Sequence, residues 1–353
     1  LYSDILMRLS EFDYVLPPER IAQQPLPERD ASRLLWLHRD TGQCEDRQFR
    51  ELPQLLRPGD LLVANDSRVF PARLRGTLAS AAGTAVEVLL LQPTEPGVWE
   101  ALARPGRKLP RGTRIWFAPG FEAEVVAALP RGERHLRFHC QGDFGELLER
   151  HGHVPLPPYI RRPDLPADRE RYQTVYSAVA GSAAAPTAGL HFSPQMLERL
   201  GDAGIEWTTV SLHVGLGTFQ PVTEEEIEAH VIHRERFTVS PAAAAALERA
   251  QREGRRIVAV GTTSARVLET IAAIAPEAGA AFAPRSGETR LYLYPGQPFR
   301  LVQAMLTNFH APRTTLLMMI AAFAGLDPVR RAYAHALASG YRFLSYGDCM
   351  LIG

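Results

Sequence analysis

A change of pattern between residues 72 and 154 constrains the fold of this chain more than any other feature of its sequence. Within this stretch the segments are short and of β type, such as AVEVLLLQP and TRIWFAP, and Gly and Pro separate them at hairpin spacing. After it, β-type segments alternate with helical ones, as in a parallel α/β sheet. We therefore predict an α/β fold: residues 1–71 and 155–353 form a large domain with a mostly parallel sheet or partial barrel, and residues 72–154 form an inserted small antiparallel β-barrel domain.

Capping signals and apolar runs locate the expected elements of the large domain. Ser or Asp followed by Pro marks the start of three predicted helices, at residues 193, 240 and 327. Thr223 and Glu226 match the capping-box pattern. Further helices are predicted over 264–274 and 315–324, and extended segments over 34–37, 61–64, 205–214, 256–260 and 300–306.

Composition argues against several kinds of site. Lys108, in GRKLPRG, is the one lysine among 39 basic residues, so a Walker A loop is excluded and a Schiff-base lysine is not expected. Cys44, Cys140 and Cys349 form no C-x-x-C pair, which argues against a zinc knuckle or a disulfide framework and favours a cytoplasmic location. The histidines show no H-E-x-x-H spacing, so we expect no metal site.

Net charge and hydropathy limit how this chain could bind nucleic acid or a membrane. The net charge is zero, so a nucleic-acid surface would have to be a local patch. The longest apolar run, TLLMMIAAFAG at 315–325, is shorter than the roughly 20 residues that a membrane-spanning helix needs, and we expect no membrane segment. Met7, which opens MRLSEFDY, is the expected native start, so residues 1–6 are left out of the predicted elements.

Four predicted strands are followed by loops of small and polar residues. The loops read ANDSRV at 64–69, HVGLGTF at 213–219, VGTTSARVLET at 260–270 and LTNFHAPRTTL at 306–316. Ligands of open α/β folds bind where such loops follow the carboxyl ends of strands, and a helix N-terminus favours anionic oxygens. In GTTSAR, Thr262 or Thr263 alternatively serves only to cap the helix. Gln220 stands where the third glycine of a dinucleotide fingerprint belongs, so a dinucleotide site is weakly supported.

Three histidines, His191, His213 and His310, each stand among apolar neighbours. A single histidine of this kind is more often a structural residue than a functional one. All three nevertheless fall in loops expected at one edge of one sheet. This convergence favours a shared site.

Two basic segments are candidates for binding RNA. LARPGRKLPRGTRIWF at 102–117 contains five basic residues and no acid, so on a hairpin it would follow a phosphate backbone or form an ordinary solvated surface. YIRRPDLPADRERYQTVY at 159–176 mixes arginines, acids and tyrosines, and would stack on bases or form a salt-bridged connector.

Seven segments of the chain resemble the S-adenosylmethionine:tRNA ribosyltransferase-isomerase family of queuosine biosynthesis. They are SEFDYVLPPERIAQQPLPERDASRLL, LLVANDSRVFPARL, AAPTAGLHFSPQML, SLHVGLGTFQPV, VAVGTTSARVLET, LTNFHAPRTTLLMMIAAFAG and YRFLSYGDCMLI. The resemblance runs in order from Met7 to the C-terminus, and the β insertion is its least similar part. It implies a large α/β domain with an inserted small β-barrel, in agreement with the pattern above.

The resemblance also implies a reaction. Enzymes of this family move the ribosyl group of S-adenosylmethionine onto the aminomethyl group of 7-aminomethyl-7-deazaguanine at the wobble position of tRNA. Epoxyqueuosine forms, and adenine and methionine leave. S-adenosylmethionine is a consumed substrate, and no cofactor is implied. The RNA partners would be the tRNAs that accept aspartate, asparagine, histidine and tyrosine. We expect a cytoplasmic monomer.

The positions that match the family's segments receive roles from the resemblance. His191 or His213 is the candidate base, with Asp66 as a competitor, and the loop 261–264 would hold the methionine carboxylate with Arg266 nearby. The residues expected to bind the substrates are Asn65, Ser67, Arg68, Thr187, Gly189, Gly215, Gly217, Thr218, Phe219, Gly261, Thr262, Thr263, Ser264, Arg266, Thr307, Asn308, His310, Tyr346 and Asp348. Those expected to contact tRNA are Arg104, Arg107, Lys108, Arg111, Arg161 and Arg162.

Two other functions stay open at this point. An S-adenosylmethionine-dependent tRNA methyltransferase would usually carry an acidic and then a glycine-rich loop after its first strand, which this sequence does not show. A non-catalytic RNA-binding protein would account for the basic hairpin but would leave the converging polar loops without a purpose.

Overall fold

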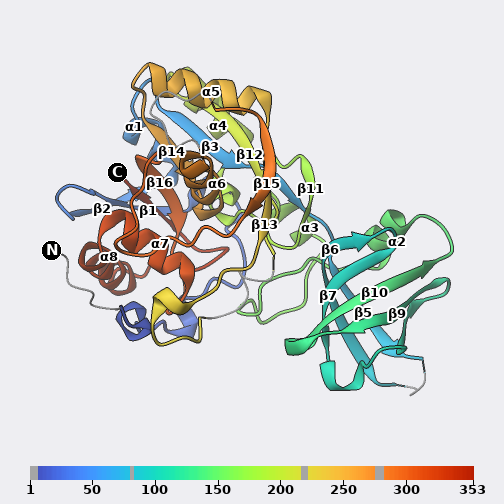
Figure 1. Ribbon diagram of the computed structural model, residues 1–353. Coiled ribbons are helices and arrows are strands. Elements are labelled where there is room, and N and C mark those ends of the chain that lie inside the picture. The colour runs from blue at the N-terminus through green and yellow to red at the C-terminus, as the bar shows by residue number, and fades with distance from the viewer. Residues whose placement is uncertain (1–6, 80–82, 216–221, 275–281) are drawn as a thin grey trace.

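Two bodies make up the molecule, a layered α/β body and a β-barrel beside it (Figure 1). The computed structural model describes residues 7–79, 83–215, 222–274 and 282–353. None of the helices in these ranges has the length and hydropathy that a membrane span requires. The chain leaves the larger body at Arg73 and returns beside the same point, where Arg73 pairs with His153.

A nine-stranded sheet forms the centre of the larger body. In spatial order its strands are β15 (Arg285–Thr289), β13 (Glu235–Val239), β12 (Glu206–Leu212), β3 (Leu61–Asn65), β14 (Ile257–Val260), β16 (Ala304–Asn308), β17 (Cys349–Ile352), β1 (Arg33–Leu37) and β2 (Cys44–Gln48). The four central strands, β12 to β16, are mutually parallel, and antiparallel pairs flank them. The sheet as a whole is therefore mixed. The four strands that precede the predicted polar loops are parallel to one another.

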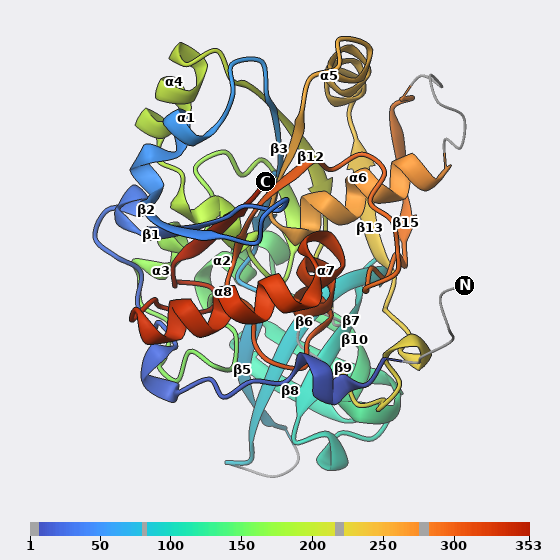
Figure 2. The same ribbon diagram turned by 90° about the vertical axis from the view of Figure 1, so that its left-hand side faces the viewer.

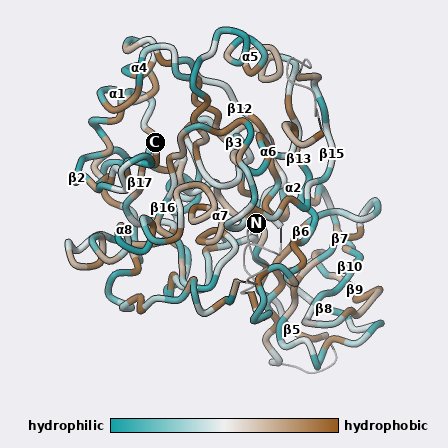
Figure 3. The backbone as a smooth tube through the Cα atoms, turned by 60° about the vertical axis from the view of Figure 1, so that its left-hand side comes forward, coloured by the Kyte–Doolittle hydropathy of each residue, from teal (hydrophilic) through white to brown (hydrophobic). Residues whose placement is uncertain are grey.

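Helices cover both faces of this sheet, because its central strands are apolar on both sides. On β3, Leu61 and Val63 join the core under α5 (Pro241–Arg252), α6 (Thr262–Ile274), α7 (Thr315–Ala324) and α8 (Leu326–Ala338). Leu62 and Ala64 face the other core, under α1 (Leu52–Leu55) and α4 (Pro194–Asp202). Figure 2 shows α1 and α4 on one side of the sheet and α5 and α6 on the other. In Figure 3, hydrophobic residues gather around β3 and β12.

The smaller body is a closed antiparallel barrel with the strand order β10-β7-β6-β5-β8-β9. Its strands are β5 (Arg73–Leu78), β6 (Ala85–Glu95), β7 (Val98–Arg104), β8 (Arg114–Ala118), β9 (Phe121–Ala128) and β10 (Glu133–Cys140). Alternate side chains fill the interior, and α2 (Phe144–His151) adds Leu147 and Leu148 to that core. The α/β fold with a β-barrel, predicted from the sequence, is confirmed.

A small parallel pair of strands and two short helical turns lie beside the central sheet. Strand β4 (Ser67–Val69) pairs with β11 (Val179–Ser182), and α3 (Asp168–Arg171) lies in the connection between the barrel and β11. After β11, a 3-10 helix over Thr187–His191 carries the first of the three histidines. This turn lies against β16, which brings a distant part of the sequence to the parallel strand ends.

Several predicted boundaries need correction. Strand β16 begins at Ala304 rather than at 300, because the carboxylate of Glu269 accepts the backbone N–H groups of residues 300–302 at 2.7, 3.0 and 2.8 Å. Helix α6 begins at Thr262 rather than at 264. The predicted capping box is wrong, since the Thr223 hydroxyl donates to the neighbouring Glu224 at 3.0 Å and no α-helix follows.

Candidate active site

A pocket of about 130 Å³ lies at the carboxyl ends of the central parallel strands. Parallel neighbours end at the same edge of a sheet, so the loops after β14 and β16 meet there, and the turn at Thr187 joins them. Tyr159, Tyr172 and Ser345 add walls from other parts of the chain. Eight of the predicted site residues line this pocket: Thr187, Gly261, Thr262, Thr263, Arg266, Thr307, Asn308 and His310.

The loop between β14 and α6 turns tightly into the helix. Gly261 has φ +89°, a conformation that L side chains rarely adopt, and its N–H donates to the Leu306 carbonyl at 2.7 Å. Ser264 donates its hydroxyl to the Val260 carbonyl at 2.8 Å, so this side chain is used within the helix. The hydroxyl oxygen of Thr263 is buried and has no hydrogen-bond partner among the described residues. The first turn of α6 thus presents backbone N–H groups and one unused hydroxyl to the pocket.

His191 is held from both ring nitrogens. Ser32 Oγ lies 2.8 Å from Nδ1, and the Asn308 amide nitrogen lies 3.2 Å from Nε2. The side chain is 4% exposed, and burial, together with Arg342 and Arg29, lowers the pKa of His191 to about 3. His191 borders a small space of about 20 Å³ rather than the larger pocket, and it reaches that pocket only through Asn308. The neutral ring therefore orients Asn308.

His310 is also buried and neutral. Its Nε2 lies 2.8 Å from the Thr307 hydroxyl, and its backbone N–H donates to the Tyr333 hydroxyl at 2.8 Å. Burial lowers the pKa of His310 to about 3. Asn308, between these residues, donates its amide to the Leu344 carbonyl at 3.3 Å, and its Oδ1 is buried without a partner in the described part of the chain. The end of β16 thus offers a fixed, unused acceptor.

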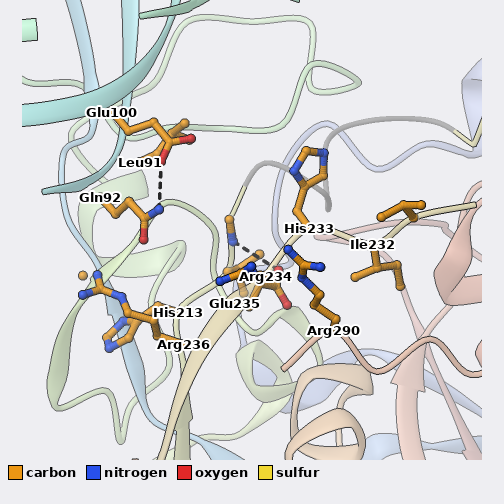
Figure 4. A pocket seen from close by; sticks show the side chains of 14 residues that line it. Leu91, Gln92, Glu100, His213, Ile232, His233, Arg234, Glu235, Arg236 and Arg290 are labelled. Atoms are coloured by element: carbon orange, nitrogen blue, oxygen red, sulfur yellow. Dashed lines mark hydrogen bonds between the residues drawn. The ribbon is translucent and has the colours of Figure 1, made fainter. Parts of the chain in front are cut away.

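A second pocket, of about 450 Å³, adjoins the first and contains His213 (Figure 4). Val214 lines both pockets. On the barrel side stand Gln92 and Glu100, whose side chains bond to each other at 2.8 Å. His213 is half-buried, its Nδ1 has no partner among the described residues, and burial and the nearby Arg236 lower its pKa. Within the described residues, Nδ1 of His213 is thus unused, whereas both ring nitrogens of His191 are engaged.

A buried ion pair lies where the two pockets meet. Arg266 of α6 lines the smaller pocket, and Glu235 at the start of β13 lines the larger one. Arg266 Nη1 donates to Glu235 Oε2, and Glu235 Oε1 accepts the Gly215 N–H at 3.2 Å. Glu235 was not among the predicted site residues, because it is the first residue of a strand and lies outside the four polar loops.

The residues at the end of β3 and in the loop after it hold β3 and β12 together at this edge of the sheet. Asn65 accepts the N–H groups of Ser67 and Leu212 at 3.0 Å each and donates to the Leu212 carbonyl at 3.0 Å, so it ties β3 to β12. Asp66 accepts the hydroxyls of Thr209 at 2.9 Å and Ser211 at 2.6 Å. None of these loop residues lines the two pockets.

The remaining predicted binding residues fall into three groups. Gly189 and Ser67 are buried beside the site, while Arg68 is exposed. A Cβ on Gly189 would lie 2.0 Å from the Tyr176 hydroxyl oxygen, so this glycine permits close packing. The Tyr346 hydroxyl donates to Asp168 at 2.8 Å. Asp348 accepts the backbone N–H groups of Arg33 and Arg342 at 2.9 and 2.8 Å. Both side chains therefore hold the C-terminal segment in place. Gly217, Thr218 and Phe219 lie outside the described residues.

A groove of about 1110 Å³ between the barrel and the larger body carries part of the predicted RNA surface. Arg104 and Arg107 line it, and Lys108 and Arg111 are exposed on the same hairpin. The buried Arg134 donates to the carbonyls of Leu109, Leu129 and Gly106, which fixes the shape of that hairpin. Arg161 is exposed elsewhere, and Arg162 forms a bidentate pair with Asp168 at 2.6 and 2.8 Å.

Within the described residues, metal ligands do not cluster near these pockets. Over the ranges that the structure describes, no group of three His, Cys, Asp or Glu side chains is arranged to hold a metal ion. The polar side chains of the smaller pocket are hydroxyls, the Asn308 amide, the neutral His310 imidazole and the paired Arg266 guanidinium, and the larger pocket adds His213, two carboxylates and further arginines. Such groups suit hydrogen bonding, proton transfer and the binding of a carboxylate.

Comparison with known proteins agrees with the family suggested by the sequence. The family model described as "Queuosine biosynthesis protein" matches residues 9–352. Relatives named S-adenosylmethionine:tRNA ribosyltransferase-isomerase, from Solibacter usitatus and Moorella thermoacetica, are 52% and 51% identical, each over 98% of this chain and 100% of the relative. The crystal structure of the S-adenosylmethionine tRNA ribosyltransferase from Thermotoga maritima is 40% identical, covers 97% of this chain and 100% of its own, and superposes with a TM-score of 0.55. This chain belongs to the queuosine biosynthesis protein family.

Proposed function

We propose that this protein is an S-adenosylmethionine:tRNA ribosyltransferase-isomerase. It transfers and isomerises the ribosyl group of S-adenosylmethionine onto 7-aminomethyl-7-deazaguanine at the tRNA wobble position, and it releases adenine and methionine. The observation that carries the proposal is full-length identity of about one half to enzymes of that name. The two adjoining pockets, which share Val214, support it by offering room for two reactants side by side.

The smaller pocket suits the amino-acid part of S-adenosylmethionine. Hydroxyls, an amide and a guanidinium line its volume of about 130 Å³. A helix N-terminus and an arginine are the groups that proteins use to bind a carboxylate, and α6 supplies both through residues 261–264 and Arg266. Asn308 Oδ1 and the Thr263 hydroxyl remain for the ammonium group and for the ribose.

His213 is the best-supported base of the three candidates. A base needs an unprotonated atom that reaches the substrate. His213 lines the larger pocket, its lowered pKa keeps it neutral at physiological pH, and its Nδ1 is unused among the described residues. His191 engages both ring nitrogens, and Asp66 accepts two hydroxyls.

The chemistry follows from the sulfonium of S-adenosylmethionine. The positive sulfur acidifies the C5′ protons, so His213 removes one of them. The electron pair left at C5′ breaks the C4′–O4′ bond and so opens the ribose ring. The freed O4′ forms a carbonyl at C1′ as adenine leaves, and adenine takes up the proton that His213 removed. The aminomethyl nitrogen of the tRNA base then attacks the ribosyl fragment, and closure of the epoxide expels methionine as the thioether. The protein contributes a neutral base, a site for the carboxylate and walls that exclude water.

The RNA partner would reach this site across the groove beside the barrel. The wobble base is unpaired in its loop, so presenting it costs little stacking energy. Arg104, Arg107, Lys108 and Arg111 stand where a phosphate backbone would pass. The tRNAs that accept aspartate, asparagine, histidine and tyrosine are the proposed substrates of a cytoplasmic monomer.

Product analysis tests the proposal. The protein is mixed with S-adenosylmethionine and a tRNA that carries 7-aminomethyl-7-deazaguanine, and small molecules are separated by chromatography. We expect adenine and methionine in equal amounts, and only with this tRNA. S-adenosylhomocysteine as the product would show methyl transfer instead. If S-adenosylmethionine neither reacts nor raises the melting temperature, the protein is an RNA binder and the proposal is wrong.

A further inference from the structure

The ion pair between Arg266 and Glu235 is unusual because both groups are charged and almost fully buried. Arg266 is 8% exposed and Glu235 is 4% exposed. Buried charges are costly to desolvate, and such a pair is seldom more stable than apolar side chains of similar volume. Stability alone is therefore a weak reason to place an arginine and a glutamate at this point.

Among the described residues, the Arg266 guanidinium is hydrogen-bonded at Nη1 and not at its other two nitrogens. Nη1 donates to Glu235. Nε and Nη2, which share the opposite edge, are buried and have no partner among the described residues. Two parallel N–H groups on one edge match the two oxygens of a carboxylate, and a buried unpaired N–H costs free energy until it is matched. The unused edge belongs to a side chain that lines the 130 Å³ pocket.

Glu235 also acts on the second pocket. Its Oε1 accepts the Gly215 N–H at 3.2 Å, two residues after His213. In Figure 4, Glu235 lies near the centre of the pocket, with His213 on one side of it and His233 on the other. One carboxylate therefore contacts both the helix that carries Arg266 and the loop that follows β12.

We propose that Glu235 is a positioning residue for substrate recognition: by binding Nη1 of Arg266 it presents the Nε–Nη2 edge to the carboxylate of S-adenosylmethionine. The inference rests on the proposed function in taking S-adenosylmethionine as the substrate. Glu235 lies outside every motif of the sequence, and the two residues have different roles. Arg266 contacts the substrate, and Glu235 acts through Arg266.

Binding of two ligands in the absence of tRNA tests the proposal. Calorimetry measures the dissociation constants of S-adenosylmethionine and of its decarboxylated analogue, which keeps the sulfonium, the adenosine and the amine. We expect the wild-type protein to prefer S-adenosylmethionine by about 10- to 100-fold, the usual effect of a hydrogen-bonded charge. Arg266→Lys, which keeps the charge and loses the paired edge, should lose most of this preference.

Glu235→Gln and Glu235→Asp test the positioning role. Both should lower the preference for S-adenosylmethionine over its analogue at least several-fold while the affinity for the analogue stays within about twofold. Glu288→Gln, on the neighbouring strand and exposed, is the matched control and should bind both ligands as the wild type does. Thermal denaturation shows that each variant is folded, and Glu235→Asp keeps the charge if Glu235→Gln is unstable.

The outcomes separate the two proposals. If the folded Glu235 variants keep the wild-type preference, Glu235 is a structural residue and the inference is wrong. If the wild type binds both ligands equally, Arg266 does not bind the carboxylate, and the inference is also wrong although the reaction stands. If the wild type binds neither ligand, the proposed function itself fails.

Discussion

The amide nitrogen of Asn308 lies 3.2 Å from Nε2 of His191, and this contact joins the end of β16 to a turn 117 residues earlier in the chain. Ser32 occupies the other ring nitrogen of His191 at 2.8 Å. The imidazole is therefore a fixed part of the wall, and the polar group that it directs toward the pocket is Asn308. His213, with an unused ring nitrogen among the described residues, is left for proton transfer.

Replacing His213 tests the assignment of the base. His213→Gln keeps a polar side chain of similar size but removes the basic nitrogen, so turnover should fall about 100-fold or more. The release of adenine from S-adenosylmethionine in the presence of substrate tRNA measures it. The melting temperature should stay close to that of the wild type, because the residue is only half-buried. Turnover near the wild-type rate would mean that His191 or Asp66, and not His213, is the base.

The two buried histidines should make the protein sensitive to acid. The pKa of His191 and of His310 is about 3 when folded and 6.5 when unfolded. The unfolded state binds more protons between these values, so the stability that each ring contributes is complete above pH 6.5 and is lost as pH falls toward 3. Each histidine should lower the free energy of unfolding by about 1.4 kcal/mol between pH 7.5 and 5.5.

Urea denaturation at the two pH values measures this loss. His310→Asn should show a loss smaller by about 1.4 kcal/mol than that of the wild type, because the titrating group is gone. His139→Asn, at an exposed position on β10, is the control. The same dependence on pH in His310→Asn and the wild type would show that His310 is not held neutral.

Asn65 should matter for stability rather than for binding. Its side chain makes three hydrogen bonds of 3.0 Å, two with the backbone of Leu212 on β12 and one with the N–H of Ser67. Asn65→Ala leaves buried backbone groups unpaired and should lower the free energy of unfolding by about 2 to 4 kcal/mol. Urea denaturation measures the change, and Arg68→Ala, exposed three residues later, should leave stability nearly unaltered. A small effect of Asn65→Ala would mean that water replaces the lost bonds.

The hairpin between β7 and β8 should contribute to RNA affinity through charge. Arg107→Gln and Lys108→Gln should each weaken tRNA binding and lower the slope of log affinity against log salt by about one. Fluorescence anisotropy over a range of salt concentrations measures both quantities. Arg252→Gln, exposed on α5 away from the barrel, is the control. An unchanged slope in both hairpin variants would place the RNA elsewhere.

Much of the architecture follows from local pattern. Alternating apolar residues and Gly or Pro turns predict the barrel strands, and Ser-Pro or Asp-Pro pairs predict three helix starts that the structure places at 194, 241 and 326. The start of β16 was predicted wrongly because a distant side chain competes with local preference. Glu269 bonds to residues 300–302 and delays β16, which no pattern within that segment reveals.

For the site, the sequence by itself determined the family, the strand-end loops and the residue types that those loops carry. The tertiary structure alone decided which of them share a pocket. His191 and His213 look alike in sequence, yet burial and the partners Ser32 and Asn308 engage both nitrogens of the first, while the second lines the larger pocket. Glu235 gains its place only when β13 packs beside β12 and meets Arg266. The physical reason is that a side chain's partners and solvation depend on residues far away in the sequence, which meet only after the sheet has formed.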